Sequence, residues 1–65
     1  MLDVLLRKNG TARHWVISEF AGRWVSRYTD GQSITFGGFD TLALALAQKA
    51  QSEAEIAAAK ADGWT

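Results

Sequence analysis

The chain has 65 residues, no cysteine, and seven acidic and seven basic side chains. A chain of this length builds one domain with a small core, and the lack of cysteine excludes a disulfide framework and a thiolate zinc site. A formal charge of zero argues against nucleic-acid binding driven by bulk charge alone. We expect a cytoplasmic protein, since residues 1–10 do not resemble a signal peptide and no run could span a bilayer.

The first half of the chain has the pattern of short strands separated by turn dipeptides. Asn9-Gly10 favours a two-residue type I′ turn, because both residues tolerate a positive φ. Ala21-Gly22 and Asp30-Gly31 offer two further turns. The sequence therefore predicts an antiparallel meander of three to four strands within residues 1–38, with strands over residues 2–7, 12–20, 23–29 and 33–37.

From Asp40 the pattern changes to that of a helix. Asp40 or Thr41 can cap its N-terminus, and strong helix formers continue to residue 61. Gly63 is typical of a helix stop, so the helix is expected over residues 41–61 and a tail over residues 62–65. The whole chain, residues 1–65, is then a single α+β domain in which one C-terminal helix covers the sheet.

Two features of this helix remain open. Ser52 begins a capping-box pattern, so a bend or break near Ser52 and one straight helix are both compatible with the sequence. In a straight helix Ile56 lies outside the expected buried face, and Trp64 is expected to fold back on an apolar surface. The face expected to pack on the sheet contains Leu42, Ala43, Leu46, Ala47, Ala50, Ala54, Ala57 and Ala61.

The turns decide which side chains of the sheet face the helix. Two-residue turns at Asn9-Gly10 and Ala21-Gly22 place Leu2, Val4, Leu6, Trp15, Ile17, Trp24, Ser26 and Tyr28 on the core face. A three-residue loop over residues 29–31, with Gly31 in a G1 bulge, would add Ile34 and Phe36 to that face. The opposite face then carries Arg7, His14, Val16, Ser18, Phe20, Arg23, Val25 and Arg27.

A second register is possible, since Ala-Gly is a poor type I′ pair. If Ala21-Gly22 closes a three-residue loop, every strand residue before it changes face. Arg13, Trp15 and Ile17 would then lie on the open face. Arg23 and Arg27 point away from the helix in either register, so they are the firmest candidates for contact with a partner.

No group of residues indicates catalysis. A single histidine and no cysteine leave no nucleophile with its base and no metal set, so we expect no enzyme, no metal, no cofactor and no small-molecule substrate. Guanidinium groups bind phosphates and guanine edges, and an exposed tryptophan stacks on bases. The candidate residues for binding nucleic acid or another partner are Arg7, Lys8, Arg13, His14, Trp15, Arg23 and Arg27.

Part of the chain resembles a known DNA-binding family. Gly22-Arg23-Trp24, a short turn, a strand ending at residues 36–41 and an alanine-rich helix are similar to the AP2/ERF domain and to the arm-binding domains of phage-type integrases, over about residues 14–50. The resemblance implies a sheet that enters the major groove of DNA with Arg23 outward and Trp24 toward the helix. The alternative is a protein-binding module, such as a phage-encoded inhibitor or adaptor, that uses the same face, with or without forming a homodimer.

Overall fold

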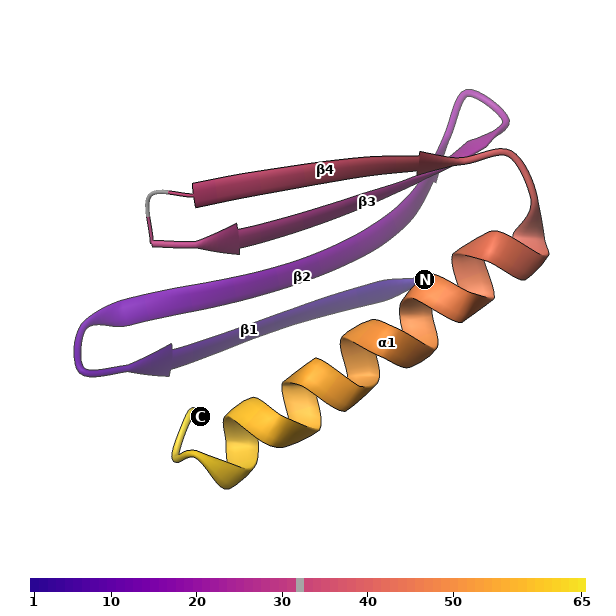
Figure 1. Cartoon of the computed structure of the whole chain (residues 1–65). Coiled ribbons are helices and arrows are strands. Elements are labelled where there is room, and N and C mark those ends of the chain that lie inside the picture. Colours follow the sequence, from indigo (N-terminus) through magenta and orange to yellow (C-terminus); the bar gives the residue numbers. More distant parts are fainter. Residues whose placement is uncertain (32) are drawn as a thin grey trace.

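The computed structural model describes residues 1–31 and 33–65 and confirms the expected α+β arrangement (Figure 1). Four strands form one antiparallel sheet in the order β1-β2-β3-β4, and a single helix follows them. The elements are β1 (Leu2–Lys8), β2 (Thr11–Phe20), β3 (Arg23–Asp30), β4 (Ser33–Phe39) and α1 (Leu42–Ala61). No helix in these residues is long and apolar enough to cross a membrane.

The turns at Asn9-Gly10 and Ala21-Gly22 both have two residues. Asn9 and Gly10 have φ values of 52° and 78°, and Ala21 and Gly22 have 53° and 78°, as a type I′ turn requires. The adjoining strands pair as Lys8 with Thr11 and Phe20 with Arg23. The alternative register, with a three-residue loop at Ala21-Gly22, is therefore wrong. Ala21 adopts the left-handed conformation that a two-residue turn requires, although alanine rarely does so.

The strain at Ala21 leads to a stabilising substitution. A non-glycine residue in the left-handed region costs about 1–2 kcal/mol, and asparagine carries a smaller penalty because its side chain bonds locally. We expect Ala21→Asn to raise the free energy of unfolding by about 0.5–1 kcal/mol, measured by urea denaturation. Gly22→Ala should lower it, because Gly22 also has a positive φ. Equal midpoints for the two variants would contradict this geometry.

The expected bulge between β3 and β4 is wrong. Asp30 pairs directly with Ser33, and Thr29 pairs with Ile34. Residues 29 and 30 thus belong to the ladder rather than to a loop, which shifts the register of β4 by one residue. Ile34 and Phe36 consequently point away from the helix and are 58% and 68% exposed. Gln32 lies outside the described residues.

The core lies between the sheet and the second half of α1. Trp15 and Ile17 of β2 are 3% and 1% exposed, and Ile56 of α1 is 7% exposed. The rings of Trp15 and Tyr28 are 5.2 Å apart at a tilt of 44°, and the Trp15 indole Nε1 donates to Glu55 Oε1 at 3.4 Å. The buried residues of this cluster are Leu6, Trp15, Ile56, Ala59 and Trp64.

The helix presents a different face to the sheet from the one expected. Its buried residues are Ala45, Ser52, Ile56 and Ala59, whereas the expected face is exposed, including Leu42 at 53% and Leu46 at 49%. Alanine has little apolar area to bury. Burial of the Ile56 side chain therefore contributes more free energy than burial of several alanines, and it decides which face of α1 packs on the sheet. The helix is also continuous through Ser52, whose hydroxyl accepts a hydrogen bond from Gln48 Nε2 at 3.4 Å.

Hydrogen bonds at both ends fix the length of α1. Thr41 is the N-cap, and its hydroxyl oxygen accepts from the Leu44 amide at 3.2 Å. After the helix, Gly63 takes a φ of 94° and turns the chain back, as expected of a helix stop. Trp64 then enters the core at 7% exposure, which confirms that it folds back.

The last residue joins the edge of the sheet. The Arg7 amide donates to the Thr65 carbonyl at 2.7 Å, and the Thr65 amide donates to the Arg7 carbonyl at 3.1 Å. The Arg13 guanidinium carbon lies 4.2 Å from the centre of the Trp64 ring, a cation–π distance. The tail therefore fastens the end of α1 to both β1 and β2.

The phenol of Tyr28 gives stability a dependence on alkaline pH. Burial first, and then the Asp30 carboxylate, raise the pKa of Tyr28 above its ordinary value of 10.0. The folded state holds the phenol proton more tightly than the unfolded state does. The protonated phenol therefore adds to the free energy of unfolding in full below pH 10, and this stabilisation is lost as pH rises through the folded pKa. We expect Tyr28→Phe to flatten the fall in the free energy of unfolding above about pH 10, measured by urea denaturation. An unchanged slope would contradict this.

Candidate recognition surface on the open sheet face

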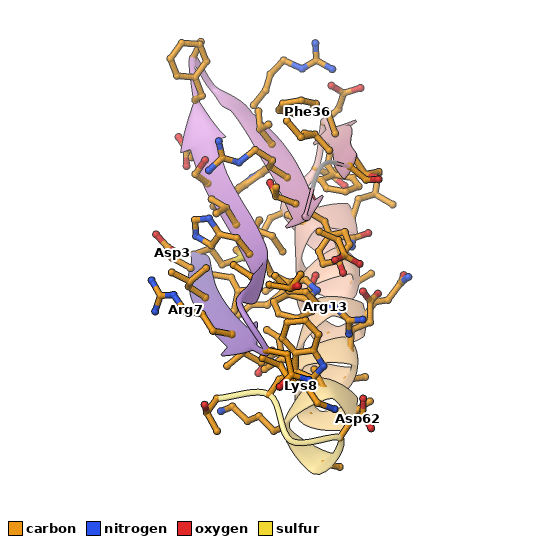
Figure 2. The ribbon with its side chains drawn as sticks, turned by 90° about the vertical axis from the view of Figure 1, so that its left-hand side faces the viewer. Asp3, Arg7, Lys8, Arg13, Phe36 and Asp62 are labelled. Atoms are coloured by element: carbon orange, nitrogen blue, oxygen red, sulfur yellow. The ribbon has the colours of Figure 1, made fainter. Side chains whose placement is uncertain are left out.

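One face of the sheet is turned away from α1, and we call it the open face. Directly paired residues of an antiparallel sheet share a face, so the register assigns its members. They are Asp3, Leu5, Arg7, Ala12, His14, Val16, Ser18, Phe20, Arg23, Val25, Arg27, Thr29, Ile34, Phe36 and Gly38. Figure 2 shows Asp3 and Arg7 on the side of the sheet away from the helix, with Arg13 and Asp62 on the helix side.

The open face is rich in uncovered apolar side chains. Leu5, Phe20, Ile34 and Phe36 are 42%, 74%, 58% and 68% exposed. Val16 of β2 and Val25 of β3 are half-buried and lie on the same face. Apolar residues scattered singly on a surface are ordinary, but a group on one face of a small domain indicates a contact surface.

A broad hollow of about 650 Å³ lies across one end of the open face. The small side chains of Ala12 and Thr29 line it, together with the larger Leu5, His14 and Ile34. Arg27 also lines it, so the hollow combines an apolar wall with one guanidinium group. Its chemistry suits an apolar side chain beside a carboxylate or a phosphate.

The charges of the open face are partly compensated. Arg23 Nη2 lies 2.9 Å from Asp40 Oδ1, and His14 Nε2 lies 2.6 Å from Asp3 Oδ1. Within residues 1–31 and 33–65, Arg7 and Arg27 form no ion pair. Both are exposed, so they are the guanidinium groups most available to an acidic partner.

Four of the seven predicted contact residues lie on the open face, spread along its length: Arg7, His14, Arg23 and Arg27. Trp15 does not, because the two-residue turn at Ala21-Gly22 sends it into the core. Arg13 also faces the helix side, where its Nε lies 3.6 Å from Asp30 Oδ2. The ammonium group of Lys8 donates to the Asp62 carbonyl at 2.6 Å.

Sequence reasoning missed the three large apolar residues Leu5, Ile34 and Phe36 among the members of the open face. The alternation of β1 from Arg7 would have found Leu5, two residues earlier on the same face. Extending the alternation of β3 through a direct Asp30–Ser33 pair would have found Ile34 and Phe36. The alternation of side chains was visible in the sequence, but Gly31 is compatible with loops of two or three residues, so the register of β4 was not determined.

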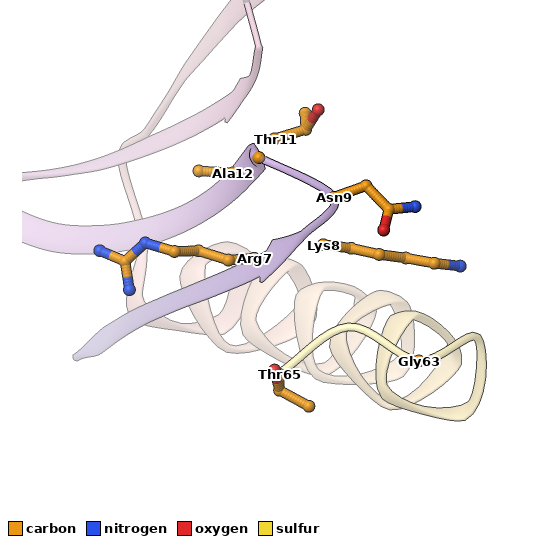
Figure 3. Close-up of a pocket in the computed structure, with 8 residues that line it drawn as sticks. Arg7, Lys8, Asn9, Thr11, Ala12, Gly63 and Thr65 are labelled. Carbon is orange, nitrogen blue, oxygen red and sulfur yellow. The ribbon is translucent and has the colours of Figure 1, made fainter.

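A second hollow, of about 420 Å³, lies between the β1–β2 turn and the C-terminal tail. Arg7, Lys8, Gly63 and Thr65 are among its lining residues. Figure 3 shows the side chains of Arg7 and Lys8 leaving β1 in opposite directions. The two cations therefore do not converge on one anion, and no group of three or more potential metal ligands exists in the described parts of the chain.

Searches of family models, curated proteins and solved structures gave no match to this chain. The resemblance to the AP2/ERF domain thus stays a prediction. The functional argument depends on the geometry and chemistry of the open face.

Proposed function

We propose that this chain is a small recognition module that binds an apolar surface of a partner protein through its open face. The observation that carries the proposal is the group of exposed apolar side chains on that face, Leu5, Phe20, Ile34 and Phe36. Aromatic side chains such as Phe20 and Phe36 are typical of the cores of protein interfaces. Arg27, which pairs with Val16 and Phe36, supplies a polar contact among the apolar side chains, and Arg7 supplies one at the β1 edge.

The size of the open face suits this function. Strands of seven to ten residues, at about 3.4 Å per residue, and four strands about 4.8 Å apart give an outline of about 500 Å². Side-chain relief makes the accessible area larger than the outline. The open face therefore approaches the area of about 800 Å² that each partner contributes to an interface of standard size.

Charge narrows the choice of partner. Arg7 and Arg27 are unpaired within the described residues, and an interface that covered them would need acceptors opposite. We infer a partner whose apolar patch includes one carboxylate opposite Arg27 and has another at its border, opposite Arg7. Such an interface needs no net charge on this chain, in agreement with its formal neutrality.

Two matched leucine variants test the proposal. Leu5 on the open face and Leu44 on the helix are 42% and 54% exposed. We expect Leu5→Asp to abolish capture of a specific protein from nuclease-treated extract of the source organism, while Leu44→Asp captures it normally. With the purified partner, Leu5→Asp should weaken binding at least about tenfold, because a carboxylate replaces a buried apolar contact.

Both variants must first show a cooperative unfolding transition. Binding through the open face would be contradicted if both folded variants captured the partner protein, or if neither did. Capture that disappears on nuclease treatment would transfer support to the nucleic-acid hypothesis.

DNA binding is the second candidate function, favoured by the placement of Arg7, His14, Arg23 and Arg27 along one face of the sheet. Contacts to phosphates release counterions, so affinity for a duplex should fall steeply between low and physiological salt. A double variant, Arg23→Ala with Arg27→Ala, should lose this binding without unfolding, as measured by fluorescence anisotropy with a labelled duplex. No binding to duplex or single-stranded DNA at low salt would exclude this candidate.

A further inference from the structure

The two edges of the sheet are built differently. The β1 edge carries Asp3, Arg7 and Lys8, and Thr65 occupies the backbone groups of Arg7. The β4 edge has the sequence SITFGGF over Ser33–Phe39, with no charge and no proline. Charged residues, proline and bulges are the usual means of preventing one edge strand from pairing with another. β4 has none of them, and its ladder to β3 is uninterrupted from Ser33 to Phe39.

The register shows which backbone groups of β4 face outward. The Phe20–Arg23 pair closes the two-residue turn, so Arg23 and every second residue after it bond toward β2. The alternate residues of β3 bond toward β4, where their partners are Ser33, Thr35, Gly37 and Phe39. The amides and carbonyls that face away from the sheet are therefore those of Ile34, Phe36 and Gly38.

The helix leaves this edge open. Figure 1 shows α1 starting below the end of β4 and running across the sheet toward β1. A hollow of about 350 Å³ separates Thr35 and Gly37 of β4 from Gln48 and Gln51 of α1. A strand can consequently approach the outer side of β4 without displacing the helix.

We propose that two copies of this chain pair through β4, antiparallel and about a two-fold axis at Phe36. Phe36 then exchanges both backbone hydrogen bonds with Phe36 of the second copy, and Ile34 exchanges both with Gly38 of the second copy. Each outward group of the three residues gains a partner in this register. The two sheets join into one continuous sheet, and the two open faces become one surface.

The side chains fit this register. The two Phe36 rings lie beside each other on the open face, where aromatic cross-strand pairs are favourable. Ile34 lies opposite Gly38 of the second copy, whose missing side chain leaves room for it. On the helix side, Thr35 lies opposite Gly37 of the second copy. No charge meets a like charge, because Ser33–Phe39 contains none.

A second copy is the occupant that this edge fits best, because the same strand supplies both the bulky and the small residue of each cross-strand pair. A foreign strand would need to provide this complementarity separately. The inference does not depend on the protein-binding function proposed above, since it rests on the outward backbone groups of β4, although Ile34 and Phe36 also belong to the open face.

Sedimentation equilibrium of the full chain tests the proposal. The expected mass is twice the chain mass of 7.1 kDa, and Phe36→Lys should return it to that of one chain, because two like charges would face each other at the axis. Phe20→Lys is the matched control, since Phe20 is similarly exposed on the open face but lies on β2. Ile34→Pro serves as a second variant if Phe36→Lys fails to fold, because it removes an outward amide only.

Amide hydrogen exchange locates the contact. The amides of Ile34, Phe36 and Gly38 should exchange more slowly as protein concentration rises, while the outward amides of Asp3 and Leu5 should not change. A monomer at millimolar concentration would overturn the proposal. So would a dimer that Phe20→Lys disrupts as strongly as Phe36→Lys, or exchange at the three β4 amides that is independent of concentration.

Discussion

Trp15→Ala is expected to unfold most of the protein at room temperature. The indole of Trp15 is 3% exposed and contacts the Tyr28 ring and the second half of α1. Removing a buried tryptophan costs about 3–5 kcal/mol, which is comparable to the whole stability that a core of this size supplies. Circular dichroism during urea titration would show a lost or much earlier transition.

The control for Trp15→Ala is Phe20→Ala on the same strand. Phe20 is 74% exposed, so its removal should change the free energy of unfolding by less than about 0.5 kcal/mol. The slipped register would reverse the two results, because it buries Phe20 and exposes Trp15. The pair of variants therefore measures the register of β2 directly.

Trp64→Ala is expected to have the second largest effect, a loss of about 3 kcal/mol. Trp64 closes the core cluster beside Leu6 and Ile56, and it is the ring on which the Arg13 guanidinium lies. Its loss should also free the Thr65–Arg7 backbone pair, so that the Arg7 amide exchanges faster. Urea denaturation and amide exchange measure the two effects on the same sample.

Thr65→Ala is the control for the tail, because Thr65 acts through its backbone. We expect it to keep both the stability and the protection of the Arg7 amide. If Trp64→Ala changed neither the free energy of unfolding nor the exchange rate of the Arg7 amide, Trp64 would not anchor the tail, and the pairing of Thr65 with Arg7 at the β1 edge would be contradicted.

Much of the fold could be predicted from local signals. Asn9-Gly10 and Ala21-Gly22 marked two turns, the change of period at Asp40 marked the helix, and Gly63 marked its end. The turn and stop signals work because each depends on the conformation of one or two residues, and the helix signal works because it repeats over many residues. The return of Trp64 to the core could also be predicted, since a large apolar ring next to a helix stop is rarely left in water.

The face of α1 could not be predicted, and the reason lies in its alanines. Eight residues formed a continuous apolar stripe, but alanine side chains contribute little free energy on burial. The isolated Ile56 instead decided the packing, together with the position of Trp15 across from it. That preference is a property of the sheet and helix together and is not visible in the helix sequence alone.

The sequence predicted which charged residues lie on the open face, but it did not predict all of the apolar residues that lie there. Arg23 and Arg27 lie on the open face in both registers, whereas the places of Arg13 and Trp15 depended on the turn at Ala21-Gly22. Ile34 and Phe36 depended on a single residue in the length of the β3–β4 turn. A one-residue change moves a whole strand to the other face, so these residues could be assigned only from the pairing itself.

The proposals for the open face depend most directly on which side chains point away from the helix. The chain has no cysteine, so Ile34→Cys and Ile17→Cys each introduce a single thiol whose rate of labelling in the folded protein reports its exposure. In dilute protein, we expect Ile34→Cys to react nearly as fast as in denaturant and Ile17→Cys at least about tenfold more slowly. Protection of Ile34→Cys to the same degree as Ile17→Cys would contradict the assignment of faces and remove the apolar part of the proposed surface.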